Sequence, residues 1–157
     1  MKIYFWSVGK AHEGYVKSGV DDFSKRISNY FKQDWEIIPP LKEASNLSET
    51  ELKKKEGGII LNKLQKDDFV VALDERGKQI SSEDLASFLQ TRANSGVKRL
   101  IFLIGGTYGL DAAVIQRANM QWSLSKLVFP HQLVRLILAE QVYRACTILK
   151  NEKYHHS

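Results

Sequence analysis

The sequence has only one cysteine, Cys146, among its 157 residues. A single thiol excludes a disulfide framework within one chain and also a cysteine-rich zinc site. The four histidines, two of them adjacent near the end, make a poor set of metal ligands, and no metal-ligand spacing occurs. We therefore expect no metal site, and we expect Cys146 to be a small buried hydrophobe.

Long hydrophobic runs are also missing, because no apolar stretch reaches the roughly 20 residues that a membrane-spanning helix needs. The first residues, Met1 to Gly9, are typical of a strand. Their apolar part is too short for a signal-peptide core, and no small-residue cleavage site follows it. These absences predict a soluble, cytoplasmic protein that does not engage a membrane.

Charge of either sign is not strongly in excess. The chain has 23 basic and 18 acidic residues, which gives a net charge of +5, and 43% of its residues are hydrophobic. This composition is that of a globular domain and excludes the collagen-like, coiled-coil and disordered classes. Most of the basic excess lies in residues 110–157. A bias of this size is compatible with a nucleic-acid partner, although many soluble proteins are equally basic.

Apolar patterns typical of strands alternate along the chain with patterns typical of helices. The alternation predicts an α/β fold with a mainly parallel sheet flanked by helices, and the length fits a single domain over residues 1–157. Strands are expected over residues 2–8, 35–38, 69–73, 100–104 and 120–125, and helices over residues 12–32, 48–64, 82–94, 111–118 and 130–149. In such folds, ligands bind at the carboxyl ends of the strands, where we expect loops at residues 74–78 and 105–109.

The last expected helix is apolar on nearly every side. Such a helix must be buried on more than one side, whereas a small sheet covers only one of them. A second copy of the chain would cover the rest, which favours a homodimer through this helix. The alternative is a central core helix within a monomer.

Two loops contain features that could hold a ligand. Gly105, Gly106 and Gly109 lie between a strand and a helix, but their spacing matches neither the dinucleotide fingerprint nor a phosphate loop. They form either a plain turn or a backbone-lined ligand site. The apolar segment 122–131 either fills the core or forms one wall of a slot for a flat ring such as adenine.

Polar residues on the last helix and at the chain end also need an explanation. His131 and Arg135 are four residues apart, as are Glu140 and Arg144, so each pair shares a helix face. They form either interface salt bridges or contacts to phosphates or to a flipped base. The end, Tyr154-His155-His156, is either a frayed tail or supplies a tyrosine and a histidine to a site.

Several of these features form separate motifs that occur in a fixed order over the whole chain. The motifs are Leu73-Asp74-Glu75-Arg76-Gly77-Lys78, Phe102-Leu103-Ile104-Gly105-Gly106-x-x-Gly109-Leu110, Trp122-Ser123-Leu124-Ser125, Phe129-Pro130-His131-x-Leu133-Val134-Arg135, Glu140-Gln141-x-Tyr143-Arg144-Ala145 and Tyr154-His155. In these residues and their spacing, the chain resembles the ribosomal RNA large-subunit methyltransferase H family of the SPOUT superfamily.

The resemblance implies a fold and an activity that the patterns alone do not indicate. The fold would be a SPOUT-type α/β knot, in which the C-terminal segment forms a deep trefoil knot, and knots are rare. The protein would be a homodimer that uses S-adenosylmethionine. Its reaction would be the methylation of N3 of pseudouridine 1915 in 23S rRNA, on the assembled 70S ribosome. The alternative is a non-catalytic factor of the same fold that binds rRNA or the ribosome.

The resemblance also assigns roles to individual residues. The implied cofactor-binding residues are Leu73, Gly105, Gly106, Leu124, Ser125, Lys126, Leu127, Val128 and Phe129. The implied substrate-binding residues are His131 and Arg135, and the implied catalytic residues are Arg144, Tyr154 and His155. The proton on N3 must leave during the reaction, and either His155 or Glu140 accepts it as a general base. Alternatively, the cationic donor and Arg144 stabilise the deprotonated base without a dedicated acceptor.

Overall fold

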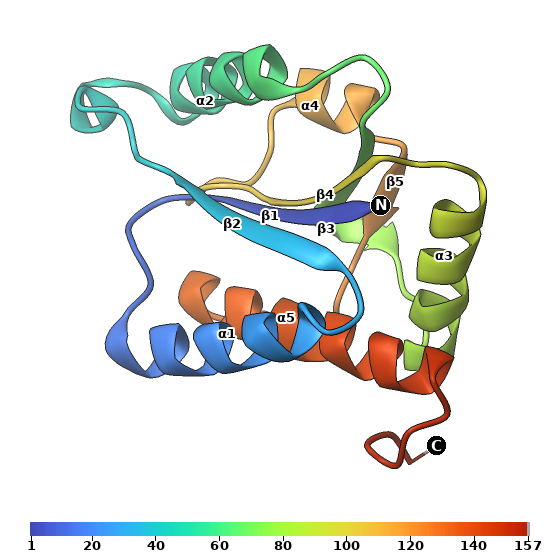
Figure 1. The fold of residues 1–157 in the computed structure, drawn as a ribbon. Helices are drawn as coiled ribbons and strands as arrows, with labels where there is room; N and C mark the ends of the chain where they lie inside the picture. Colours follow the sequence, from blue (N-terminus) through green and yellow to red (C-terminus); the bar gives the residue numbers. More distant parts are fainter. Residues whose placement is uncertain (157) are drawn as a thin grey trace.

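The computed structural model describes residues 1–156 and contains a five-stranded, all-parallel sheet with helices on both faces (Figure 1). The strands lie in the order β2-β1-β4-β3-β5. They are β1 (Lys2–Val8), β2 (Lys32–Ile38), β3 (Phe69–Lys78), β4 (Arg99–Ile104) and β5 (Met120–Trp122). The helices are α1 (Gly14–Ile27), the short 3-10 helix η1 (Ala44–Asn46), α2 (Glu49–Lys63), α3 (Ser82–Asn94), α4 (Ala112–Arg117) and α5 (His131–Leu149). The predicted α/β class is confirmed.

The sheet is buried on both faces. Helices α1, α3 and α5 cover one face, and α2 and α4 cover the other (Figure 1). In the central strand β4, Leu100 and Phe102 belong to the hydrophobic cluster under α1, α3 and α5, whereas Ile101 and Leu103 belong to the cluster under α2 and α4. The strand is therefore continuously apolar, because both of its faces are covered.

Strand β3 is longer than predicted, and the expected loop at residues 74–78 is wrong, because those residues continue the strand to Lys78. The strand bends there, since Leu73 and Lys78 both pair with Trp122 of β5. Gly77 permits this approach, because a Cβ at that position would lie 2.7 Å from the backbone nitrogen of Trp122. This part of β3 was not predicted as a strand because its residues are mostly charged, whereas the prediction relied on runs of apolar residues.

Helix α1 ends at Ile27, five residues before the predicted end at residue 32. Backbone hydrogen bonds from Tyr30 and Phe31 to the carbonyl of Ile27 close a turn there, and β2 begins at Lys32. Phe31 still packs against the core from this turn. Its apolar side chain therefore extended the helical pattern although its backbone has left the helix.

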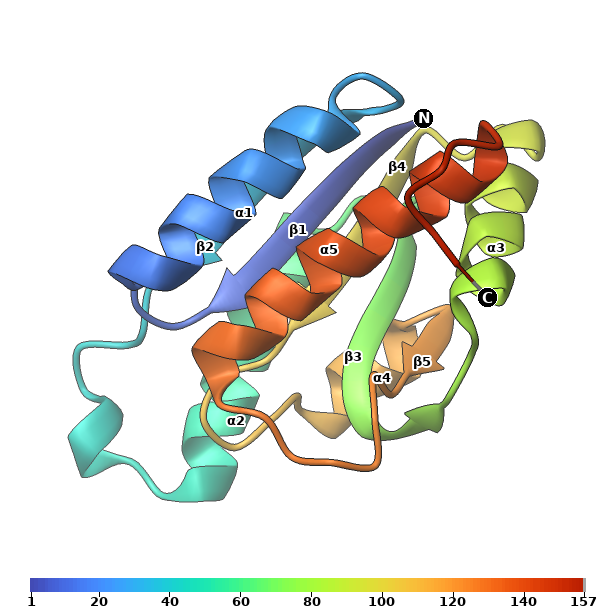
Figure 2. The same cartoon turned by 90° about the horizontal axis from the view of Figure 1, so that it is seen from below.

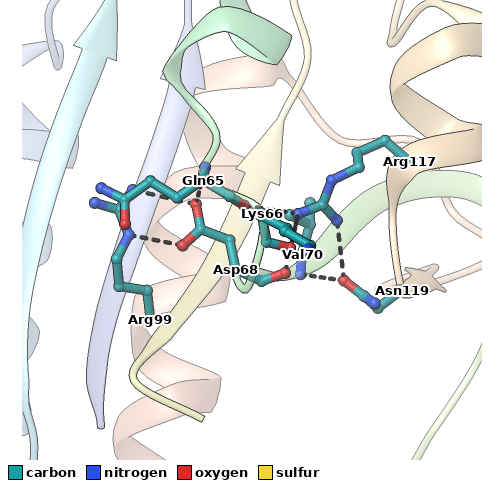
Figure 3. Close-up of polar contacts among 7 residues, drawn as sticks. All are labelled: Gln65, Lys66, Asp68, Val70, Arg99, Arg117 and Asn119. Atoms are coloured by element: carbon teal, nitrogen blue, oxygen red, sulfur yellow. Dashed lines mark hydrogen bonds and ion pairs between the residues drawn. The ribbon is translucent and has the colours of Figure 1, made fainter.

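A polar clasp holds the amino-terminal end of the sheet, at the end opposite to the carboxyl ends of the strands (Figure 3). The Asp68 carboxylate is almost fully buried and forms an ion pair with Arg99 at 2.8 Å. Arg117 donates to the backbone carbonyls of Gln65 and Asp68, and Asn119 accepts from the backbone nitrogen of Val70. These bonds join the α2–β3 connection to β4 and to the start of β5.

Helix α5 lies across the first face of the sheet, between α1 and α3 (Figure 2). Its inner side, with Leu138 and Val142, is fully buried, and Cys146 is buried as predicted. The outer side retains a half-exposed stripe, which consists of Leu133, Ile137, Glu140, Arg144 and Ile148. No helix within residues 1–156 has the length and apolar character needed to cross a membrane.

Candidate active site

A cavity of about 640 Å³ opens at the carboxyl ends of the strands. We call it the strand-end cavity. Three parts of the chain form most of it: the middle of β3 around Leu73 and Asp74, the turn 105–109 after β4, and the segment 122–131 between β5 and α5. Its size is within the range of small-molecule sites, and its position is where parallel α/β sheets bind ligands.

The turn after β4 folds back on itself and presents its backbone to the cavity. The amide of Gly109 donates to the carbonyl of Gly106 at 3.0 Å. A Cβ on Gly105 would lie 2.8 Å from the backbone carbon of Gly109, so a side chain there forces the turn apart. The glycines therefore form a cavity wall as well as the connection from β4 to α4, and the sequence alone left these two possibilities open.

The apolar segment 122–131 is partly core and partly cavity wall. Trp122 is buried in the core, whereas Leu127 and Val128 are 72% and 86% exposed. The hydroxyl of Ser125 accepts from the amide of Leu127 at 2.9 Å, which shapes the tip of this loop. Large exposed apolar side chains beside a cavity suit contact with a ligand or with another chain.

Most of the cofactor-binding residues predicted from the sequence meet at this cavity. They are Leu73, Gly105, Gly106, Leu124, Ser125, Leu127, Val128 and Phe129, and the predicted substrate residue His131 also lines it. Lys126 is exposed and is not part of the lining.

The structure adds two lining residues from α2, Glu49 and Lys53, which the sequence interpretation missed. They lie four residues apart at the start of a helix that is distant in sequence from every motif. No local signal connected them with the turn 105–109.

The charged lining of the cavity includes the carboxylates of Glu49, Asp74 and Glu75 and the cations of Lys53 and Arg76. Asp74 forms an ion pair with Arg76 in which the guanidinium donates to both carboxylate oxygens at 3.0 Å. Hydrogen bonding from Arg76 lowers the pKa of the Asp74 carboxyl, so that it remains charged.

His131 and Arg135 both point to the carboxyl end of β1. Nε2 of His131 lies 2.9 Å from the carbonyl oxygen of Val8, and burial lowers the pKa of this imidazole. The Arg135 side chain is fully buried and donates to the Ser7 hydroxyl and to the carbonyl of Lys10, each at 2.8 Å. Within residues 1–156, Arg135 forms no ion pair, and its partners are neutral.

The predicted catalytic residues gather in a second place, which we call the tail cluster: Glu83, Glu140, Arg144, Tyr154 and His155. Arg144 donates to Glu140 through Nε at 2.9 Å and through Nη2 at 2.6 Å. Its guanidinium also lies over the Tyr154 ring, 4.8 Å from the ring centroid. Because Tyr154 and His155 have specific partners, the alternative of a frayed end is wrong for these two residues.

The strand-end cavity and the tail cluster lie at opposite ends of α5. His131 is the first residue of this helix, and Arg144 follows it by thirteen residues. A rise of about 1.5 Å per residue separates their backbones by roughly 20 Å along the helix axis. Within one chain, therefore, the predicted catalytic residues do not reach the predicted cofactor residues.

A family model described as "Predicted SPOUT methyltransferase" matches residues 1–155. The chain belongs to the SPOUT methyltransferase family. Two relatives, from Christiangramia forsetii and Parabacteroides distasonis, are named "Ribosomal RNA large subunit methyltransferase H". They are 50% and 44% identical to this SPOUT chain over 156 residues, and each alignment covers 99% of both proteins.

A crystal structure of a probable methyltransferase from Bordetella pertussis Tohama I has the same fold as this SPOUT chain. The two superpose with a TM-score of 0.56 at 11% sequence identity, over 92% of this chain and 93% of the other. At this level of identity the likeness concerns the fold alone.

Proposed function

We propose that this SPOUT methyltransferase transfers a methyl group from S-adenosylmethionine to N3 of pseudouridine 1915 of 23S rRNA, in the assembled 70S ribosome in the cytoplasm. The names of the relatives support large-subunit rRNA as the substrate. The main structural support is that the glycine turn 105–109 and the segment 122–131 line one cavity at the strand ends.

The residues of the strand-end cavity fit S-adenosylmethionine. The backbone of Gly105 and Gly106 leaves a wall without side chains, which lets a ligand approach closely. Leu124 and Phe129 provide apolar surface for a flat ring such as adenine.

When bound, S-adenosylmethionine would supply a methyl group for in-line transfer to N3 of the target base, with the neutral thioether S-adenosylhomocysteine as the leaving group. The main task of the protein is to hold the two reactants close and aligned, and such positioning can supply on the order of 7–11 kcal/mol of barrier reduction. In this protein, the turn 105–109 and the segment 122–131 would hold the donor, and the tail cluster would hold the base.

The separation of the two sites along α5 supports a homodimer with shared active sites. The half-exposed stripe on α5 recurs at three- and four-residue steps, so it forms one continuous helix face. A two-fold symmetric pair of α5 helices that run in opposite directions would cover this stripe. It would also bring the tail cluster of one protomer to the strand-end cavity of its partner.

The trefoil knot is part of the same proposal. The turn 105–109 and the later segment 122–131 both line the cavity, and α5 then continues on the other side of the sheet from α4 (Figure 1). Passage of the C-terminal segment through the earlier loop would fix both cavity walls relative to each other.

The tail cluster favours one of the possible fates of the N3 proton. Oε1 of Glu140 accepts two hydrogen bonds from Arg144, and both ring nitrogens of His155 have partners. The Nδ1 lone pair of His155 and Oε1 of Glu140 are therefore engaged, and Oε2 of Glu140 accepts from the side-chain amide of Gln141 at 3.1 Å. This arrangement supports a role for Arg144 in stabilising the negative charge of the deprotonated base, with the proton leaving to water.

Methyl transfer to purified ribosomes tests the proposal. Ribosomes from a strain that lacks this modification, incubated with the protein and labelled S-adenosylmethionine, should gain one methyl group per 23S rRNA at pseudouridine 1915. Ribosomes that already carry the methyl group are the matched control and should gain none. Ribosome binding that does not depend on the donor, together with no incorporation, would instead support the non-catalytic factor.

A further inference from the structure

Four side chains form a continuous hydrogen-bonded row in the tail cluster. Glu140 accepts from Arg144 at 2.9 and 2.6 Å, and Nη1 of Arg144 lies 3.2 Å from Nδ1 of His155. The other ring nitrogen, Nε2 of His155, lies 2.8 Å from Oε1 of Glu83. The row thus runs from α5 through the C-terminal tail to α3, and Glu83 is its outer end.

The positions of the protons in this row follow from the donors alone. An arginine guanidinium has five N–H donors and no acceptor, so Nδ1 of His155 must accept from Arg144 with its lone pair. A neutral imidazole then carries its proton on Nε2, which donates to the Glu83 carboxylate. A proton on Nδ1 would instead face an N–H group of Arg144, and the contact would be lost.

We propose that Glu83 is a positioning residue for methyl transfer, which fixes His155 in the tautomer with a proton on Nε2 and thereby orients the guanidinium of Arg144. The inference rests on the proposed function, because it assigns Arg144 to the target base. Glu83 itself acts only through His155, which belongs to the same protomer.

The backbone position of Glu83 does not depend on the tail. It lies in the first turn of α3, where Ser81 and Asp84 form a reciprocal capping box. Negative charge is favoured at this end of a helix, because the unpaired backbone N–H groups are there. The hydrogen bond from His155 lowers the pKa of the Glu83 carboxyl, in agreement with a charged acceptor at this position.

The tail is also anchored at points that do not involve Glu83. The hydroxyl of Tyr30 donates to Glu152 at 2.6 Å, and the ring of Tyr154 packs edge-on against Tyr143 at 4.7 Å between centroids. The amide of Glu152 donates to the carbonyl of Thr147 at 3.0 Å, which closes the end of α5. Loss of the Glu83 carboxylate should therefore weaken the preference of His155 for a proton on Nε2 and leave the tail attached.

Nitrogen NMR of the histidine rings tests the assignment directly and without turnover. In protein labelled with ¹⁵N-histidine, the ring shifts show which nitrogen carries the proton, and a His155→Phe variant identifies the His155 signals. We expect mainly the Nε2-protonated form in the natural sequence and in Glu83→Gln, whose amide oxygen still accepts. Glu83→Ala should raise the fraction of the Nδ1-protonated form, because only the longer contact of 3.2 Å with Nη1 of Arg144 then favours a proton on Nε2. A Nδ1-protonated His155, or a ratio that Glu83→Ala leaves unchanged, would overturn the proposal.

Kinetics on ribosomes then separates positioning from a merely structural role. Glu83→Ala should lower kcat about threefold to tenfold, the loss expected for one hydrogen bond to a carboxylate that is half-exposed to solvent, and leave KM for S-adenosylmethionine unchanged. Glu83→Gln should restore most of kcat. Tyr30→Phe is the control, because it loosens the other tail anchor and should leave the His155 tautomer unchanged. An equal loss in both Glu83 variants, or no loss in either, contradicts the inference. If the proposed function fails, no variant methylates, whereas the tautomer measurement still gives a result.

Discussion

Arg135 donates from Nε to the hydroxyl of Ser7 at 2.8 Å, which ties the buried side of α5 to the carboxyl end of β1. Its Nη1 also donates to the carbonyl of Lys10, and it lies 3.2 Å from Nδ1 of His12. The guanidinium is thus fully buried among neutral acceptors, and burial lowers its pKa. From its position four residues after His131, Arg135 could have contacted RNA. In this fold its side chain instead holds the loop that follows β1.

Arg135→Ala should therefore destabilise the protein strongly. The substitution removes a large buried side chain and leaves the Ser7 hydroxyl and the Lys10 carbonyl without their donor, at a cost of about 2–5 kcal/mol in the free energy of unfolding. Urea denaturation followed by circular dichroism measures this cost. Lys17→Ala, at a side chain that is 63% exposed, is the control and should change stability by less than about 0.5 kcal/mol. Equal values for the two variants would contradict a structural role for Arg135.

Gly105→Val should abolish binding of the proposed cofactor, S-adenosylmethionine, and leave the proposed homodimer intact. The added side chain collides with the backbone of Gly109 and with Leu110, so the wall of the strand-end cavity must move. Titration calorimetry with S-adenosylhomocysteine measures the affinity, and sedimentation measures the dimer. Gly58→Ala is the matched control, because a Cβ at that position of α2 meets nothing within 4 Å. Unchanged affinity in Gly105→Val would remove this turn from the site.

Much of the fold could be predicted from the sequence because most of its elements carry strong local signals. Helix α3 has the predicted bounds, since Ser81 supplies a cap and the apolar positions repeat with the helical period. Strand β4 is one continuous apolar run, and the structure extends the prediction only to Arg99. The charged end of β3 was missed because its pairing with β5 depends on a register shift and on Gly77, which local patterns do not encode.

Only those residues of the candidate site that belong to the sequence motifs could be predicted. The residues of the glycine turn and of segment 122–131 lie close in sequence to two strand ends, so they could be placed together. Glu49 and Lys53 come to the cavity from a distant helix, and Glu83 comes to the tail cluster from another. The spacing of His131 and Arg135 shows that they share a helix face, but it does not distinguish a buried face from an exposed one.

The stability of the protein should fall more steeply below pH 6.5 than its carboxylates alone require. Burial lowers the pKa of His131 from its ordinary value of 6.5, so the unfolded chain binds a proton that the folded chain does not. The stability from neutral His131 is therefore complete above the unfolded pKa and is lost as the pH falls below it. His131→Gln should flatten the dependence of the free energy of unfolding on pH between 7.5 and 5.5, measured by urea denaturation. His156→Gln, at an exposed histidine, is the control and should keep the steeper slope; equal slopes in the two variants would refute this assignment.

Mixed dimers should show that each active site uses both protomers. Gly105→Val distorts the wall of the strand-end cavity, and Arg144→Ala removes the guanidinium of the tail cluster. A homodimer of either variant should therefore be inactive. A dimer with one protomer of each kind retains one complete site, because the intact cavity of one chain meets the intact Arg144 of the other. Co-purification with two affinity tags isolates this dimer, and its methylation rate should be about half that of the unmodified protein. In the converse dimer, both substitutions are in one chain and its partner is unmodified. That dimer should be inactive, since each of its two sites then contains one spoiled half. If the second dimer were active and the first were not, each site would be built from a single chain.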